Sequence, residues 1–178
     1  MNEKKIIFNN FLKMIKNRNI KIKKEYIDNK NINYENIYNN VNILDENSKI
    51  YFKFYDLKIG VKNIKTEVID YLKDKDIDSL ILITKFKFNS YILNKLKELN
   101  IEVEFFSFNN FYFNLIEHDL VPKHEILTEK YEKIIKEKFN NKLPLIKKTD
   151  PICKYYNCKS GQVLKIYRKH EIYYRLVA

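Results

Sequence analysis

Both cysteines of the chain lie in one short stretch, DPICKYYNCKSGQV, where Cys153 and Cys158 are five positions apart. A structural zinc site needs four ligands, usually supplied as two close pairs, and this sequence has no second cysteine pair. A redox pair normally has the spacing C-x-x-C. We therefore predict no metal site and no cofactor here. The thiols are expected to be small buried or half-buried groups.

Two other stretches have residue types suited to catalysis. HDLVPKH, which begins at His118, holds two imidazoles and a carboxylate, but no plausible nucleophile accompanies them. A metal-dependent nuclease of the restriction-endonuclease type needs carboxylates for Mg2+ and a lysine that helps to activate water. DLK supplies Asp56 and Lys58, and Asp45 lies upstream. Because D-x-K is common in a lysine-rich chain, we predict no catalytic residue and keep the nuclease as an alternative.

The charge is strongly basic, with a formal net charge of +11, and lysine provides nearly all of the positive charge. Only Arg18, Arg168 and Arg175 are arginine. Lysine lacks the planar fork that recognises bases bidentately, so any contact with nucleic acid would be a backbone contact without sequence preference. The abundance of Lys, Asn, Ile, Tyr and Phe also fits an AT-rich genome, so the charge alone does not identify a partner.

The composition indicates a folded chain. Of the 178 residues, 45% are hydrophobic and 15% aromatic, which is enough for a packed core. The apolar run at residues 80–83 is far too short to span a bilayer. The chain starts with MNEKKIIFNNF, which lacks the apolar segment of a signal peptide, so we do not expect secretion or a membrane partner.

The first 116 residues alternate between helical and strand patterns. An amphipathic helix is expected at 2–17, with Ile7, Phe11, Leu12 and Ile15 on its inner stripe. KIYFKFY, SLILIT and IEVEFFSF read as strands, and SLILIT is apolar enough to be buried on both faces. Helices are expected between them, one capped by Thr66 and one starting at Asn89 or Ser90. KIGVKNI is expected to form a short strand or turn. This alternation predicts a small α/β sheet.

After residue 116 the pattern changes, and all three prolines follow. Thr128 should cap a helix that carries Tyr131, Ile134, Ile135 and Phe139 on its inner stripe. Asp150 and Pro151 are typical of a helix start, and Asn157 can adopt the left-handed conformation that ends a helix. QVLKIYR and IYYRLV should then pair as strands. We predict an α+β protein of two domains, 1–116 and 117–178.

The C-terminal third closely resembles a small assembly subunit of RNA polymerases. EHDLVPKHEILT, LPLIKKTDPICKYYNCKSGQVLKIYR and YYRLV are similar to the fifth subunit shared by eukaryotic RNA polymerases I, II and III and to its smaller archaeal counterpart. Upstream, YFKFYDLKIGVKNIK and SLILIT look like the eukaryote-type N-terminal domain of that family. The resemblance implies a non-catalytic subunit whose C-terminal module docks on the largest polymerase subunit. The N-terminal domain would have a restriction-endonuclease-like fold and form part of the lower jaw near downstream DNA.

The resemblance also implies which residues meet partners. The family's proline-bearing loop after the central strand lies toward DNA, and here it reads KFKFNS without proline, so the DNA-proximal candidates are Lys85, Lys87, Asn89 and Ser90. Candidates for the interface with other subunits are His118, Pro122, Tyr155, Tyr156, Gly161, Arg168, Tyr174 and Arg175. The expected partners are the largest subunit, other polymerase subunits and, weakly and without sequence preference, duplex DNA. No homo-oligomer is expected.

One further function remains open at this point, and so does the source of the chain. The chain could be a stand-alone, non-specific DNA-binding protein, which would bind DNA tightly without a polymerase. Its trimmed N-terminal domain and AT-coded composition suit a large DNA virus or a reduced eukaryotic parasite. We therefore expect a nuclear location for a cellular protein, and the host cytoplasm or the virion for a viral one.

Overall fold

The computed structural model describes residues 3–28, 32–45, 49–58, 64–73, 75–87, 90–97 and 101–178. The chain divides into two compact units, 1–113 and 114–178, which we call unit 1 and unit 2. This division lies a few residues before the boundary at 116/117 that the sequence predicts. Each unit has its own four-stranded sheet, in agreement with the expected α+β class.

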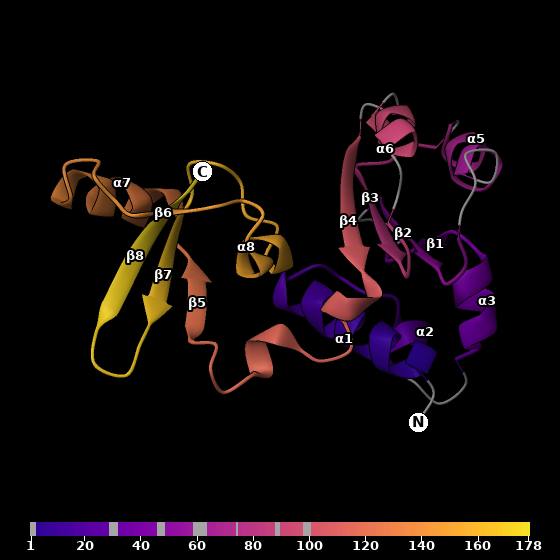
Figure 1. Cartoon of the computed structure of the whole chain (residues 1–178), viewed down its shortest axis with the longest axis horizontal. Helices are drawn as coiled ribbons and strands as arrows, with labels where there is room; N and C mark the ends of the chain where they lie inside the picture. Colours follow the sequence, from indigo (N-terminus) through magenta and orange to yellow (C-terminus); the bar gives the residue numbers. More distant parts are fainter. Residues whose placement is uncertain are drawn as a thin grey trace. The chain divides into compact units, whose positions relative to one another are not determined.

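Unit 1 is built on a mostly parallel sheet (Figure 1). Strands β2, β3 and β4 run parallel in that order, and β1 pairs antiparallel with the outer edge of β2. The predicted strands are confirmed, with β3 at the expected residues. The bounds are β1 Asn42–Ile43, β2 Ile50–Tyr55, β3 Ser79–Thr84 and β4 Glu102–Ser107.

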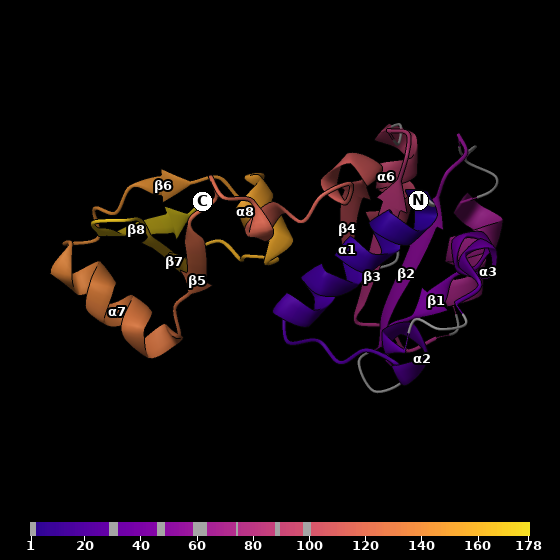
Figure 2. The ribbon, with the colours of Figure 1, turned by 90° about the horizontal axis from the view of Figure 1, so that it is seen from below.

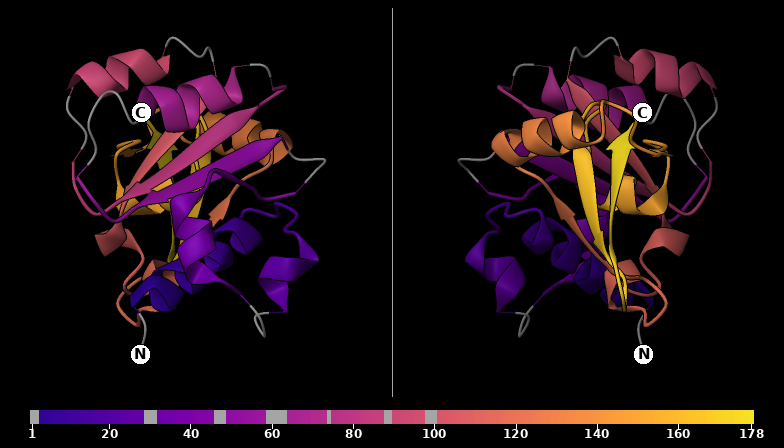
Figure 3. Two further views of the ribbon diagram at one scale, coloured as in Figure 1. Left: turned by 90° about the vertical axis from the view of Figure 1, so that its right-hand side faces the viewer. Right: turned by 90° about the vertical axis from the view of Figure 1, so that its left-hand side faces the viewer.

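Helices cover both faces of this sheet, with α5 and α6 on one side and α1, α2 and α3 on the other (Figure 3). Alternation along β2 explains the arrangement: Phe52 and Phe54 contact Phe8 and Phe11 of α1, whereas Tyr55 belongs to the core beneath α5 and α6. The bounds are α1 Glu3–Asn17, α2 Lys24–Ile27, α3 Tyr34–Asn39, the π-helical η1 Lys65–Ile69, α5 Asp70–Leu72, α6 Ser90–Lys97 and the 3-10 turn η2 Phe108–Asn110.

Two N-terminal predictions are tested by these elements. The inner stripe of α1 is confirmed, because Ile7, Phe11, Leu12 and Ile15 are all buried. The prediction that Thr66 caps the next helix is wrong, because helical backbone already begins at Ile64 and Thr66 lies inside η1. The expected strand or turn in KIGVKNI falls almost wholly outside the described residues.

Unit 2 is a mixed sheet in the order β5-β7-β8-β6, flanked by two helices (Figure 2). The predicted C-terminal hairpin is confirmed, since β7 and β8 pair antiparallel from Val163 opposite Leu176 to Tyr167 opposite Ile172. Strand β6 runs parallel to β8 and was not predicted. The bounds are the 3-10 turn η3 Leu115–Glu117, β5 Lys123–Ile126, α7 Glu129–Lys138, β6 Leu145–Ile146, α8 Pro151–Tyr155, β7 Val163–Tyr167 and β8 Ile172–Val177.

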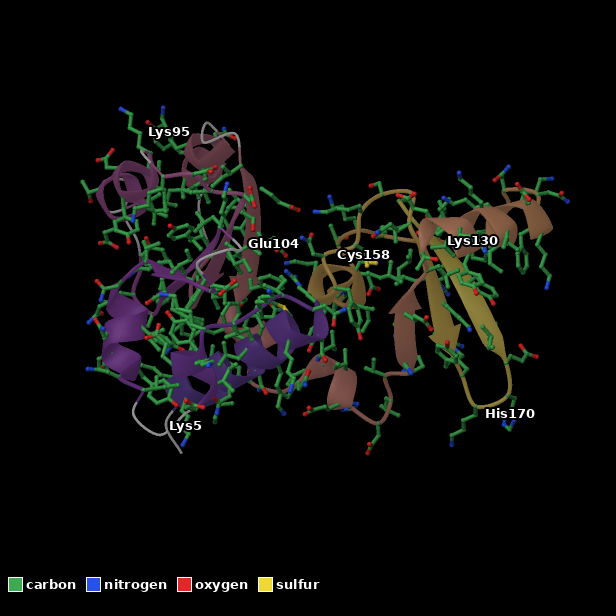
Figure 4. The ribbon with its side chains drawn as sticks, turned by 180° about the vertical axis from the view of Figure 1, so that it is seen from behind. Lys5, Lys95, Glu104, Lys130, Cys158 and His170 are labelled. Carbon is green, nitrogen blue, oxygen red and sulfur yellow. The ribbon has the colours of Figure 1, made fainter. Side chains whose placement is uncertain are left out.

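The segment around the cysteines folds as the sequence predicts. The Asp150 carboxylate accepts a hydrogen bond from the Ile152 backbone N–H at 2.9 Å, Pro151 starts α8, and Asn157 has φ +52°. Cys153 and Cys158 are free thiols buried in the core of unit 2, where they pack with Leu164 and Val177. Cys158 is labelled in Figure 4. Burial raises the pKa of the Cys153 thiol.

The predicted inner stripe of α7 is wrong for three of its four residues, whereas Ile135 is half-buried. Tyr131, Ile134 and Phe139 are 59%, 49% and 40% exposed, and the residue that α7 buries most deeply is Glu132. The Glu132 carboxylate accepts a hydrogen bond from the Val163 backbone N–H at 3.0 Å. An unpaired amide at this buried position is costly, and the carboxylate therefore determines which side of the helix faces the sheet.

A buried ion pair holds the end of α1 against β4. Arg18, which follows α1, forms two hydrogen bonds of 2.7 and 2.8 Å with the Glu104 carboxylate, and both side chains are almost inaccessible. The fork geometry of arginine allows both bonds at once. Such a pair offsets the cost of burying its two charges only while it is intact.

We expect the substitution Arg18→Ala to destabilise unit 1 by about 3–5 kcal/mol, because it leaves the Glu104 charge buried without its partner. The double substitution Arg18→Met with Glu104→Leu should recover most of that loss. Urea denaturation followed by circular dichroism measures both, with the exposed Lys16→Ala as control. An Arg18→Ala variant as stable as the control would contradict a structural role for the pair.

Buried tyrosines make unit 1 sensitive to alkaline pH. Tyr26, Tyr38 and Tyr55 are each less than 10% exposed, and burial raises the pKa of each phenol well above its ordinary value. The Lys53 ammonium, also buried, donates to the Tyr38 carbonyl at the end of α3 at 2.9 Å. Burial lowers the pKa of Lys53, so its effect on the pH dependence has the opposite sign.

The folded chain keeps phenol protons that the unfolded chain loses above about pH 10. The tyrosine contribution to stability is therefore fully present below that pH and declines as the pH rises further. We expect Tyr38→Phe to reduce this alkaline loss. Urea midpoints measured between pH 8 and 11 test this expectation. An equal fall of the midpoint with rising pH in the wild type and in Tyr38→Phe would contradict it.

Candidate partner-binding surfaces

A cavity of about 690 Å³ lies in unit 2 between the tip of the β7–β8 hairpin and the segment that leads into β5. Its size is within the range of small-ligand and side-chain pockets. Exposed Leu120 stands at its edge, with 85% of its surface accessible. The lining residues are Asp119, Leu120, Pro122, Tyr167, Arg168, Lys169, His170, Glu171 and Tyr173. His170 is labelled at the hairpin tip in Figure 4.

The hairpin fixes the aromatic and basic groups of this cavity. The Arg168 backbone N–H donates to the Glu171 carbonyl at 3.0 Å, which closes the turn. The Arg168 guanidinium lies over the Tyr173 ring at 5.0 Å from its centroid, and the Tyr173 hydroxyl donates to the Glu171 carboxylate at 2.7 Å. Glu171 raises the pKa of the Tyr173 phenol through this hydrogen bond. Arg168 is thus exposed but positioned by its ring contact.

Of the eight predicted interface residues, the cavity brings together Pro122 and Arg168. The other predicted arginine, Arg175, donates to the Leu145 carbonyl at 3.2 Å. Tyr155 is buried, and its hydroxyl donates to the Asn114 side chain at 3.3 Å. Tyr174 contacts the Phe139 ring at 6.0 Å between centroids. These three side chains hold unit 2 together internally.

The remaining predicted interface residues lie apart from the cavity lining. His118 is exposed, and its Nδ1 accepts the Leu120 backbone N–H at 3.2 Å. Tyr156 is half-buried and contacts the Tyr155 ring. Gly161 has φ +89°, and its carbonyl accepts a hydrogen bond from the Lys136 ammonium at 2.6 Å. The positive φ accounts for glycine at this turn.

The exposed stripe of α7 was not predicted from the sequence. Tyr131 and Ile134 face solvent, and Leu145, the first residue of β6, is also 59% exposed. Their apolar spacing suggested a core-facing helix. The signal that could have indicated otherwise is Glu132, whose carboxylate reaches a strand amide and turns the apolar stripe outward.

In unit 1, the predicted DNA-proximal residues follow β3 at the carboxyl end of the sheet. Lys85 and Lys87 are exposed. The Lys85 backbone N–H donates to the Tyr55 carbonyl at 2.9 Å, and its ammonium lies 4.0 Å from the Glu3 carboxylate. Asn89 lies outside the described residues, and Ser90 is the first residue of α6.

The arrangement of carboxylates that the alternative nuclease would require is not assembled. Asp45 follows β1 beside the start of β2, whereas Asp56 follows the end of β2. The six residues of β2 separate them by roughly 20 Å. Asp56 forms an ion pair with Lys4 at 3.2 Å. Among the described residues, no group of three or more His, Cys, Asp or Glu side chains is arranged to hold a metal ion.

His124, the second histidine of HDLVPKH, lies in strand β5. Its Nδ1 lies 2.6 Å from the Pro122 carbonyl, and burial lowers the pKa of the imidazole.

The helices of the described residues are all too short or too polar to span a membrane.

Comparison with known proteins identifies similar chains. The family described as RNA polymerase Rpb5, C-terminal domain, matches residues 113–178. DNA-directed RNA polymerases I, II, and III subunit rpabc1 of Dictyostelium discoideum is 33% identical over 135 residues, covering 71% of this chain and 68% of that protein. DNA-directed RNA polymerase subunit Rpo5 of Methanosarcina mazei is 42% identical over 73 residues, covering 36% of this chain and 94% of that protein.

Plant relatives are similar over a shorter part of their length. DNA-directed RNA polymerase V subunit 5A of Arabidopsis thaliana is 28% identical over 132 residues, which cover 72% of this chain. The chain spans 60% of that protein and 54% of the Arabidopsis subunit 5B of RNA polymerases IV and V.

We expect Glu132→Ala to destabilise unit 2 by about 2–3 kcal/mol, because the buried Val163 amide loses its charged acceptor. Glu132→Gln keeps an acceptor at the same place and should lose less. Thermal and urea unfolding measure both, with the exposed Glu137→Ala on the same helix as control. Equal stability of Glu132→Ala and the control would contradict this role.

Proposed function

The chain belongs to the fifth-subunit family of DNA-directed RNA polymerases, and from that membership we propose that it is a non-catalytic subunit of a multisubunit RNA polymerase. The observations that carry the proposal are the family match at residues 113–178, which coincides with unit 2, and the similarity to almost the whole archaeal protein, 94% of its length at 42% identity. In that relative, a module of this size is an entire polymerase subunit. Unit 2 therefore has the extent expected of a complete assembly module.

In this proposal, unit 2 docks on the largest polymerase subunit. Its surface supports such a role, because large apolar side chains remain exposed around the cavity and along α7. Interfaces of this kind rely on a few aromatic and arginine anchors surrounded by less important contacts. Arg168 stacked on Tyr173 is an anchor of that type. Those exposed side chains are Leu120, Tyr131, Ile134, Leu145, Ile172 and Tyr173.

Unit 1 would then form part of the lower jaw, with Lys85 and Lys87 toward downstream DNA. Exposed lysines attract phosphates without reading sequence, so binding by the isolated chain should be weak and salt-dependent. A cellular protein of this kind would work in the nucleus, and a viral one in the host cytoplasm or the virion.

No catalytic step is assigned to this chain. The carboxylates required for the alternative Mg2+-dependent nuclease lie at opposite ends of β2, and Asp56 is paired with Lys4. The polymerase active site would lie on other subunits.

The proposal is tested by purifying the tagged chain from its native source. A polymerase largest subunit should co-purify in stoichiometric amount. Because truncation of a buried anchor costs more than about 1 kcal/mol, the double substitution Arg168→Ala with Tyr173→Ala should weaken that association at least several-fold. Tyr71→Ala, an exposed aromatic of unit 1, is the matched control. Failure of the wild-type chain to retain any polymerase subunit would overturn the proposal.

A further inference from the structure

An exposed aromatic ring stands between two lysines at the carboxyl end of β3. Residues 85–87, Lys-Phe-Lys, form what we call the KFK loop. Phe86 is 47% exposed, and Lys85 and Lys87 are exposed on either side of it. Strand β3 itself is apolar and almost fully buried, whereas the phenylalanine beyond its end keeps about half of its surface accessible.

Hydrogen bonds fix the KFK loop. The buried Thr84 hydroxyl donates to the Phe86 carbonyl at 2.5 Å, and the Lys85 backbone N–H donates to the Tyr55 carbonyl at 2.9 Å. The loop is therefore tied to the ends of two adjacent strands. The backbone that carries the Phe86 ring is held in this way and loses little conformational freedom when the ring binds a ligand.

The loop after β2 lies beside the KFK loop. Tyr55 and Thr84 are paired in the parallel register of β2 and β3, so both strands end at the same level. The loop after β2 contributes Leu57, 76% exposed, and exposed Lys58. Two neighbouring loops thus each present an apolar side chain next to lysine.

The carboxylates of Asp56 and Glu3, which lie near this edge, already have partners. Asp56 is held by Lys4 at 3.2 Å, and the Glu3 carboxylate accepts the Tyr112 hydroxyl at 2.6 Å. Within the described ranges, no carboxylate forms an ion pair with Lys58 or Lys87. Their ammonium groups are available for phosphates.

We propose that the KFK loop, with Lys58 beside it, binds single-stranded nucleic acid, Phe86 stacking on an unpaired base and the lysines contacting the flanking phosphates. A duplex hides its base faces within the stack, whereas a single strand presents them to an aromatic ring. The site therefore prefers single strands to duplex. This inference rests on the DNA-proximal position proposed for unit 1 and adds the form of nucleic acid that the loop recognises.

Fluorescence anisotropy of the full chain tests the preference. Labelled 12-nucleotide single-stranded DNA and RNA are compared with a 12-base-pair DNA duplex at several salt concentrations. We expect either single strand to bind more tightly than the duplex, and Phe86→Leu to weaken single-strand binding about tenfold while leaving duplex binding unchanged. Phe86→Trp should retain the tighter binding of single strands. Lys85→Gln with Lys87→Gln should flatten the salt dependence by about 0.7 per lost phosphate contact.

Tyr71→Leu, an exposed aromatic of unit 1, is the matched control and should bind nucleic acid as the wild type does. Duplex binding as tight as single-strand binding, or unchanged single-strand binding by Phe86→Leu, would overturn the inference. Co-purification with the polymerase is measured on the same variants. Phe86→Leu should still co-purify with the polymerase. Failure of the wild-type chain to co-purify would count against the proposed function, whereas the single-strand preference of the variants tests the KFK loop separately.

Discussion

The Glu132 carboxylate determines which side chains of α7 lie on the surface of unit 2. The amide of Val163 opens β7 in the interior of the unit, and the side chain that satisfies it comes from α7 rather than from a neighbouring strand. With Glu132 directed at the sheet, the helix cannot also direct Tyr131 and Ile134 there. The apolar stripe consequently remains on the outside. A polar requirement of the interior thus produces an apolar surface, which is the property expected of a chain that works as part of a larger assembly.

Unit 1 obeys a different constraint. Its parallel strands are covered on both faces, so the strand ends are the places where side chains can meet a ligand. At the carboxyl end, the buried Thr84 hydroxyl and the Lys85 amide fix the chain as it leaves the sheet. The hydrogen bonding of the sheet therefore continues into the first exposed residues after β3. Near this edge, Asp56 pairs with Lys4 and Glu3 lies close to Lys85, whereas Lys58 and Lys87 form no ion pair among the described residues.

Much of the fold could be predicted from local patterns. The apolar run of β3, the stripe of α1 and the Asp150–Pro151 start of α8 each depend on neighbours in sequence, and each is confirmed. The orientation of α7 and the pairing of β6 with β8 could not be predicted, because they depend on contacts between distant residues. Thr66 failed as a cap because the helix starts earlier, at Ile64.

The predicted surface residues divide in the same way. Lys85, Lys87 and Arg168 are exposed, as binding residues should be. Tyr155 and Arg175 are engaged within unit 2, since a tyrosine or arginine in a strand-rich motif serves the interior as readily as a partner. Composition and spacing do not distinguish these two uses.

The buried thiols have a practical consequence for studying such a subunit. Alkylating reagents attack thiolates that they can reach, and Cys153 and Cys158 are enclosed in apolar packing. The folded chain with its two native cysteines should therefore react only slowly with maleimides. A cysteine introduced at Leu57 would be the dominant attachment point for a fluorophore, and movements of unit 1 could be followed without first replacing either native thiol.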